Sequence, residues 1–77
     1  MPLSPRWRRA LEILADAGLS GVTNTELMAQ GFSPEMIAGL VLSGHTVETV
    51  GVEKGGDHPI KVARMRITAA GRKAIGR

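Results

Sequence analysis

The chain has 77 residues, no cysteine and a formal net charge of +3 at pH 7. One small domain spanning residues 1–77 is therefore expected, without a disulfide framework, a thiol nucleophile or a thiolate metal site. The segment 1–9 lacks the apolar core of a signal peptide, and no apolar run approaches the roughly 20 residues of a membrane span. We therefore predict a cytoplasmic protein that does not enter a membrane.

The charges are separated along the chain. Between Arg9 and Lys54 there is no lysine or arginine. The same stretch holds Glu12, Asp16, Glu26, Glu35, Glu48 and Glu53. This asymmetry says more about possible partners than the small net charge does.

A first helix is predicted from Ser4-Pro5 to Gly18. A serine hydroxyl can cap a helix, and proline suits the first helical position because its missing N–H is not needed there. Trp7, Leu11 and Leu14 then recur at helical spacing, so Trp7 is expected to anchor this helix to the core.

Two shorter helices are predicted next. Residues 19–22 leave room for a short strand, and the capping box at residues 23–26 begins a helix that runs to about Gln30, with Leu27 and Met28 facing inward. Ser33-Pro34 begins a third helix over residues 34–43. The tight link at residues 31–33 joins the pair into a helix-turn-helix unit.

The last third predicts a β-hairpin and a short final helix. Residues 46–52 are rich in β-branched side chains, and residues 60–67 alternate between apolar and basic, with Arg64 and Arg66 on one face. Gly55-Gly56-Asp57 and Pro59 indicate a loop of four to six residues at the hairpin tip. Thr68 can cap a helix over residues 69–75, so the expected class is α+β.

The phrase Arg66-Ile67-Thr68-Ala69-Ala70-Gly71-Arg72-Lys73-Ala74-Ile75 resembles the leucine-threonine-x-x-glycine-arginine phrase that ends the wing in MarR-type and related bacterial transcriptional regulators. The order of elements is similar to a small winged helix, and the resemblance covers roughly residues 20–75. It implies dimeric binding to duplex DNA, with residues 33–43 as the recognition helix in the major groove and residues 47–67 as the wing. The chain departs from that family by lacking long flanking dimerisation helices.

The chemistry of these elements favours the hairpin over the third helix as a DNA contact. The third helix has only Ser33, Glu35 and Ser43 as polar side chains, whereas base reading uses Arg, Lys, Asn or Gln. We predict a small transcriptional regulator that contacts duplex DNA mainly through a basic wing. The candidate DNA-binding residues are Thr23, Asn24, Thr25, Ser33, Glu35, Lys54, Lys61, Arg64 and Arg66.

Two groups of these residues each have two possible roles. Thr23, Asn24 and Thr25 either cradle a phosphate at the start of the second helix or only cap it. The hairpin arginines either face phosphates or pair with Glu48 across the hairpin, depending on strand register.

A second class of function uses the third helix instead. Met36, Ala38 and Leu42 lie off its core-facing stripe and would form an exposed apolar patch. The alternative is therefore a winged-helix module that binds another protein, or a second copy as a homodimer, without binding DNA.

Catalysis, cofactors and metals are not predicted. His45 and His58 stand thirteen residues apart without the spaced carboxylates of a metal site. No phosphate-binding glycine loop and no serine with a nearby base is recognisable, so the chain is not expected to be an enzyme.

Overall fold

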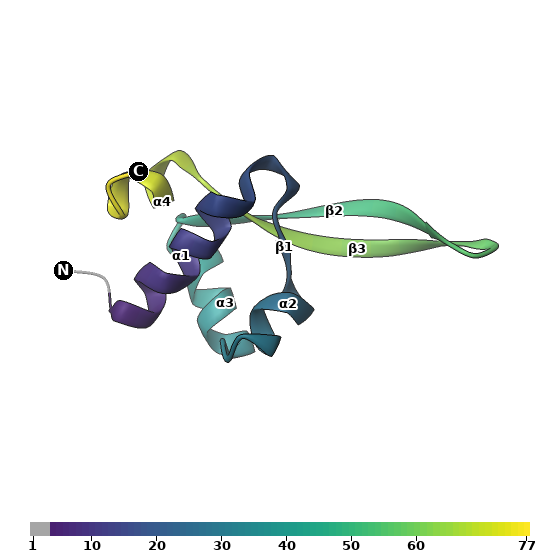
Figure 1. Cartoon of the computed structure of the whole chain (residues 1–77), viewed down its shortest axis with the longest axis horizontal. Coiled ribbons are helices and arrows are strands. Elements are labelled where there is room, and N and C mark those ends of the chain that lie inside the picture. Colours follow the sequence, from purple (N-terminus) through teal and green to yellow (C-terminus); the bar gives the residue numbers. More distant parts are fainter. Residues whose placement is uncertain (1–3) are drawn as a thin grey trace.

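The computed structural model describes residues 4–77, so the first three residues of the predicted domain lie outside the described part. In chain order the elements are α1 (Pro5–Ala17), the 3-10 turn η1 (Gly18–Ser20), β1 (Val22–Thr23), α2 (Asn24–Ala29), α3 (Pro34–Leu42), β2 (Thr46–Gly55), β3 (His58–Ile67) and α4 (Ala69–Ala74). The described chain is thus an α+β structure of four helices and a three-stranded antiparallel sheet, as the pattern predicts (Figure 1).

All four helices begin at a hydroxyl cap. Each cap side chain accepts a hydrogen bond from the amide three residues further on: Ser4 from Trp7, Thr23 from Glu26, Ser33 from Met36 and Thr68 from Gly71. These starts confirm the predicted ones, because each hydroxyl satisfies an amide that lacks a partner within its helix. The third helix ends one residue earlier than predicted, with Ser43 as its C-cap.

The sheet has the strand order β1-β3-β2, and the long hairpin pairs from Thr46↔Ile67 outward to Gly55↔His58. The predicted loop of four to six residues is wrong. The turn has two residues, and Gly56 at its first position has φ 66°, as a type II′ turn requires. Pro59 fits inside the strand because the hairpin is only two-stranded here, so no neighbour needs the N–H that proline lacks.

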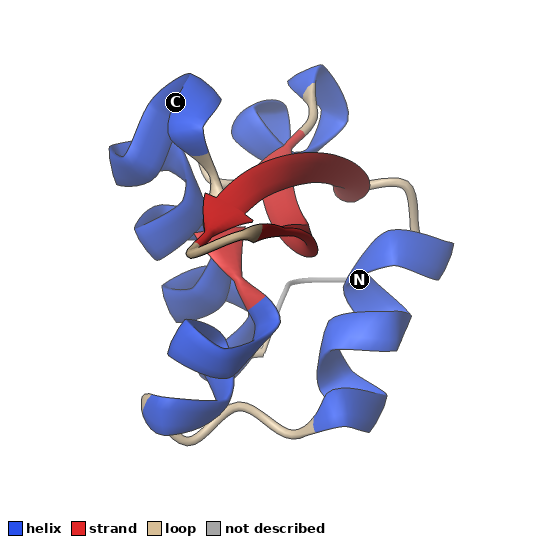
Figure 2. Ribbon diagram, turned by 90° about the vertical axis from the view of Figure 1, so that its right-hand side faces the viewer, coloured by secondary structure: helices blue, strands red, loops and turns tan. Residues whose placement is uncertain are grey.

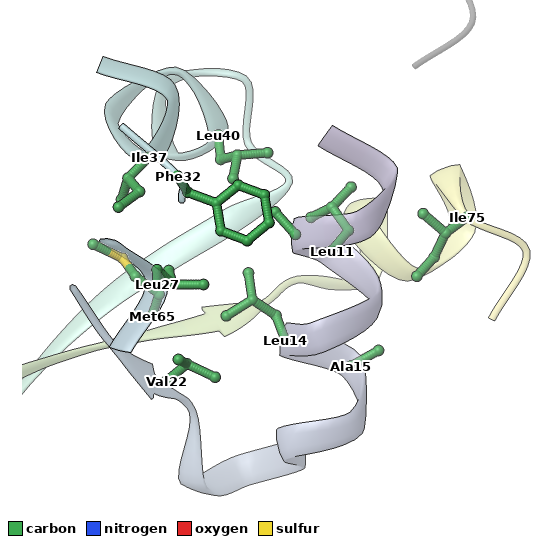
Figure 3. Close-up of a cluster of buried hydrophobic side chains, with 11 residues drawn as sticks. Leu11, Leu14, Ala15, Val22, Leu27, Phe32, Ile37, Leu40, Met65 and Ile75 are labelled. Carbon is green, nitrogen blue, oxygen red and sulfur yellow. The ribbon is translucent and has the colours of Figure 1, made fainter. Parts of the chain in front are cut away.

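The core lies between the helices and one face of the sheet. Its largest fully buried side chains are Leu11, Leu14, Leu27, Leu40 and Met65. Phe32, from the link between α2 and α3, points into this cluster (Figure 3). Trp7 is half-buried against the same cluster, which agrees with its predicted role as the anchor of α1.

Arg6 ties the start of α1 to the link between α2 and α3. Its guanidinium donates a hydrogen bond to the carbonyl of Gly31 and lies over the Phe32 ring, 5.3 Å from the ring centroid. A cation over an aromatic face is attracted by the ring quadrupole. This side chain therefore supports the packing of α1 against the helix pair.

Two methionines lie differently from their predicted positions. Met28 was expected inside, but it is 42% exposed, because the six-residue α2 turns only Leu27 fully into the core. Met36 was expected on the surface, but it packs against the core cluster. It stands four residues before Leu40, and this spacing places both on the same face of α3.

The hairpin projects well beyond the helices. The molecule measures 47 × 22 × 20 Å, and its long axis follows β2 and β3 (Figure 1). The view along that axis shows the helices grouped around the base of the hairpin (Figure 2). In the described part of the chain, no helix is both long and apolar enough to cross a membrane.

Candidate functional site: an apolar groove and the projecting hairpin

Strand alternation gives the hairpin two faces, and residues paired across the strands share a face. We call the side that carries the buried Met65 the inner face, and its opposite the outer face. The inner face consists of Thr46, Glu48, Val50, Val52, Lys54, Pro59, Lys61, Ala63, Met65 and Ile67. The outer face includes Val47, Thr49, Gly51, Glu53, Ile60, Val62, Arg64 and Arg66. Residues 50–63, which project from the helices, are called the outer hairpin.

The four predicted cations of the hairpin are divided between these faces. Arg64 and Arg66 share the outer face, as strand periodicity predicts, and they lie near the base of the hairpin. Lys54 and Lys61 lie on the inner face and nearer the tip. The hairpin therefore does not present these four side chains to one ligand surface.

One of the two arginines is held by an acidic neighbour. Nη2 of Arg64 lies 2.6 Å from Oε1 of Glu53, and the hydrogen bond and charge of that carboxylate raise the pKa of the guanidinium. Arg64 pairs with Thr49 on β2, and Gly51 is the residue between Thr49 and Glu53 on that face of the strand. Because Gly51 has no side chain, nothing at this position obstructs the contact between Arg64 and Glu53. Pairing of the arginines with Glu48 was the wrong alternative, because Glu48 stands opposite Met65 on the inner face.

Two of the five candidates at the helix starts are used within the fold. The hydroxyls of Thr23 and Ser33 accept backbone hydrogen bonds at 3.1 and 3.2 Å, which supports the capping interpretation. Thr25 and Glu35 are exposed to solvent. Asn24 is different, because its Oδ1 is buried and has no hydrogen-bond partner within residues 4–77.

Asn24 lies beside an apolar groove of about 460 Å³ between α2, α3 and the inner face of the hairpin. The groove is lined by Asn24, Met28, Pro34, Ile37, Ala38, Val41, Leu42, Glu48 and Met65. Its polar residues are Asn24 and Glu48, and the Glu48 carboxylate accepts hydrogen bonds. Such a groove suits an apolar ligand that carries a cationic donor.

Exposed apolar side chains continue from the groove onto the outer hairpin. Leu42, at the end of α3, is 88% exposed. On the inner face of the hairpin, Val50 and Val52 are 62% and 67% exposed. The predicted interface residues Ala38 and Leu42 therefore belong to a larger surface, whereas Met36 does not.

Sequence reasoning missed Met28, Val50 and Val52 as members of this surface. The valines were recognised only as strand formers. Val47 and Val50 stand at odd and even positions of β2, so the valines of this strand lie on both faces of the hairpin. The helices cover the hairpin at one end only, and both of these valines are exposed. That pattern was the available signal that some of them would remain exposed.

The described chain offers no built metal site. Within residues 4–77 no three histidine, aspartate or glutamate side chains are grouped to hold an ion. His45 contacts the hydroxyl of Ser43 through Nδ1 at 2.8 Å, and His58 stands beside the turn at the exposed end of the hairpin.

Comparison of the chain with protein-family models, with curated proteins and with solved structures found no match in any of the three. The resemblance to MarR-type regulators therefore stays a prediction from residues 66–75 and from the order of the elements.

Proposed function

We propose that this chain is a small winged-helix domain that binds protein through its groove and the inner face of its outer hairpin. The winged-helix interpretation is supported by the order α1-β1-α2-α3-β2-β3, by the short link between α2 and α3, and by the projecting hairpin. Fold alone does not determine function, so the choice of ligand depends on the surface chemistry.

The observation that carries the proposal is the set of exposed apolar side chains at the groove and on the inner face of the outer hairpin. Leu42 is 88% exposed, and Val50 and Val52 follow at 62% and 67%. Soluble monomers rarely leave large apolar patches uncovered, and patches of this kind commonly mark interaction sites. Burial of such side chains by a partner contributes about 25 cal/mol per Å² of apolar area.

The face that a winged helix turns toward DNA is poorly suited to DNA in this chain. The exposed side of α3 carries Glu35, Ala38 and Leu42, and Glu26 is exposed in the first turn of α2. Carboxylates repel phosphates, and apolar side chains supply no hydrogen bonds to base edges. A protein ligand fits these side chains better.

Site-specific photo-crosslinking in cells that express the chain tests this function. A photoreactive amino acid in place of Leu42 or Val52 should give adducts that protease removes and nuclease does not. Leu19 is the matched control, because it is 82% exposed but lies in η1, outside the groove. No adduct above this control at either position would refute the proposal.

Binding to duplex DNA is the second candidate, and one observation favours it. Lys54, Lys61 and Arg66 take part in none of the ion pairs found within residues 4–77. These cations on a projecting hairpin support weak, salt-sensitive contact with phosphates, through Lys54 and Lys61 on the inner face or through Arg66 on the outer face. Fluorescence anisotropy of a random-sequence duplex at two salt concentrations tests it, with Arg66→Ala and the pair Lys54→Ala plus Lys61→Ala as variants. Absence of binding at low ionic strength would remove this candidate.

A further inference from the structure

We propose that this chain forms a dimer by pairing the open edge of β2 with the same edge of a second copy, antiparallel and centred on Gly51. The two hairpins then lie side by side in one continuous sheet, with their inner faces on the same side. This contact goes beyond the proposed protein binding, which uses the groove and the inner face, and it is tested separately.

β2 is an end strand of the sheet, so one of its edges is open. The strand order is β1-β3-β2, and within residues 4–77 only β3 pairs with β2. Over residues 50–55 the strand projects beyond the helices (Figure 1). An open edge presents a row of unpaired N–H and C=O groups, with which another strand can pair.

The two-residue turn determines which backbone groups of β2 are unpaired. Gly55 and His58 flank this turn and therefore form a hydrogen-bonded pair, and such pairs alternate with non-hydrogen-bonded pairs along an antiparallel ladder. Pro59 stands in the next pair, opposite Lys54, where this alternation requires no N–H. The backbone groups that point away from β3 are therefore those of Thr46, Glu48, Val50, Val52 and Lys54.

The opposite edge of the outer hairpin is less suited to pairing. By the same alternation, the backbone groups of Pro59, Lys61 and Ala63 on β3 point away from β2. Pro59 has no N–H to donate there, and proline on an edge strand hinders the addition of a further strand. β2 contains no proline, so its edge keeps every donor.

The order of side chains along the edge selects one register. Two antiparallel β2 edges align their unpaired groups only when even-numbered residues stand opposite each other. With Gly51 at the centre, Glu48 stands opposite Lys54 of the second copy and Val50 opposite its Val52, and the two-fold axis repeats both pairs. Opposite charges in cross-strand pairs stabilise a sheet.

The two neighbouring registers lose these ion pairs. With Val50 at the centre, Glu48 would stand opposite Val52. With Val52 at the centre, Lys54 would stand opposite Val50. The register centred on Gly51 is therefore the one that combines aligned backbone groups with complementary charges.

The second hairpin lies in the plane of the sheet and not over the inner face, where the helices pack. Its Gly55 and Gly56, which have no side chains, come beside Val47 and Thr46 at the base of the first β2. Residues 42–44, which precede this base, are exposed to solvent. The second copy's β3 lies on the far side of its own β2, away from the first copy. Because both copies use the same edge, the contact closes as a dimer and does not extend into a filament.

Charge reversal tests the register on the purified full chain by sedimentation equilibrium from micromolar to millimolar concentration. Glu48→Lys or Lys54→Glu should each weaken the dimer about tenfold, because two symmetry-related attractions become repulsions. The double variant Glu48→Lys plus Lys54→Glu should regain most of the lost affinity, and an equimolar mixture of the two single variants should form a heterodimer. Lys73→Glu is the matched control, because it makes the same change in net charge as Lys54→Glu on the exposed surface of α4.

Proline substitutions test which edge pairs. Val52→Pro removes an N–H that points outward from β2, so it should weaken the dimer more than tenfold through the loss of two symmetry-related hydrogen bonds. Lys61→Pro is the matched control, because Lys61 is the cross-strand partner of Val52 and its N–H points outward from the opposite edge. It should leave the dimer constant unchanged.

Amide hydrogen exchange on the unsubstituted chain gives a readout that needs no variant. The amides of Val50 and Val52 should exchange more slowly at high than at low protein concentration, because pairing protects them. The amide of Lys61 should exchange at the same rate at both concentrations.

The outcomes separate this proposal from the proposed function. A dimer that persists unchanged in Val52→Pro, or in which Val50 and Val52 gain no protection, overturns pairing along β2. A dimer that ignores charge reversal overturns the register centred on Gly51. A monomer at millimolar concentration overturns the dimer altogether, and crosslinks to another protein from positions 42 or 52 would then still support protein binding. If no such crosslink forms either, both proposals fail.

Discussion

Gly21→Ala should destabilise the root of the hairpin strongly. Gly21 has φ 70° and ψ −176°, a backbone conformation that is nearly exclusive to glycine and costs other residues about 1–3 kcal/mol. A Cβ at this position would also lie 2.7 Å from the carbonyl oxygen of Met65 and 3.0 Å from Cγ of Arg66. The new methyl group would push β1 away from β3, where only Val22↔Met65 and Thr23↔Arg64 pair.

The two effects together should lower the free energy of unfolding by about 3 kcal/mol, near the upper end of the backbone cost alone. For a domain of this size, that loss lowers Tm by about 12–24 °C, measured by circular dichroism during heating. Gly18→Ala is the matched control, because Gly18 has φ 62° but no heavy atom within 4 Å of the added Cβ. Its loss should be about 1–2 kcal/mol from the backbone only. Equal Tm values for the two variants would refute the close contact between Gly21 and β3.

Three further substitutions probe other contacts. Arg6→Ala should lower the stability by about 1–2 kcal/mol in denaturant unfolding, because it removes a charged hydrogen bond and a cation–π contact, whereas the exposed Arg8→Ala should change it little. Thr68→Val should cost about 1–2 kcal/mol in the same assay, since the hydroxyl caps α4 and donates to a carbonyl at 2.6 Å. Glu53→Gln should raise the affinity for random duplex DNA in anisotropy at low salt, because it frees Arg64; an unchanged affinity would show that Arg64 makes no phosphate contact.

The helix starts could be predicted because they depend on neighbours in the chain. A hydroxyl residue at Ser4, Thr23, Ser33 or Thr68 meets the amide three positions further on whatever the rest of the molecule does. The capping box is a partial exception. The Thr23 hydroxyl accepts from the Glu26 amide, but among the hydrogen bonds of the described residues the Thr23 amide donates none to the Glu26 carboxylate.

The candidate site was harder to predict because it depends on register between distant segments. Alternation alone correctly placed Arg64 and Arg66 together, but it could not say which carboxylate lies within reach. Register sets Glu48 opposite Met65, and the absence of a side chain at Gly51 leaves the way open to Glu53. The two-residue turn then lengthens both strands, and the helices cover this longer hairpin at its base only, so Val50 and Val52 stay exposed.

The division of the cations between the two faces of the hairpin limits the salt dependence of duplex binding. A duplex on the inner face would meet Lys54 and Lys61, whereas Arg66 lies on the outer face. Release of counterions from two phosphates should lower the affinity about 12-fold between 50 and 200 mM salt, whereas three contacts would lower it about 40-fold. Fluorescence anisotropy across this salt series measures the slope. A fall of 40-fold or more would show that both faces contact phosphates, which would contradict the separation of the cations.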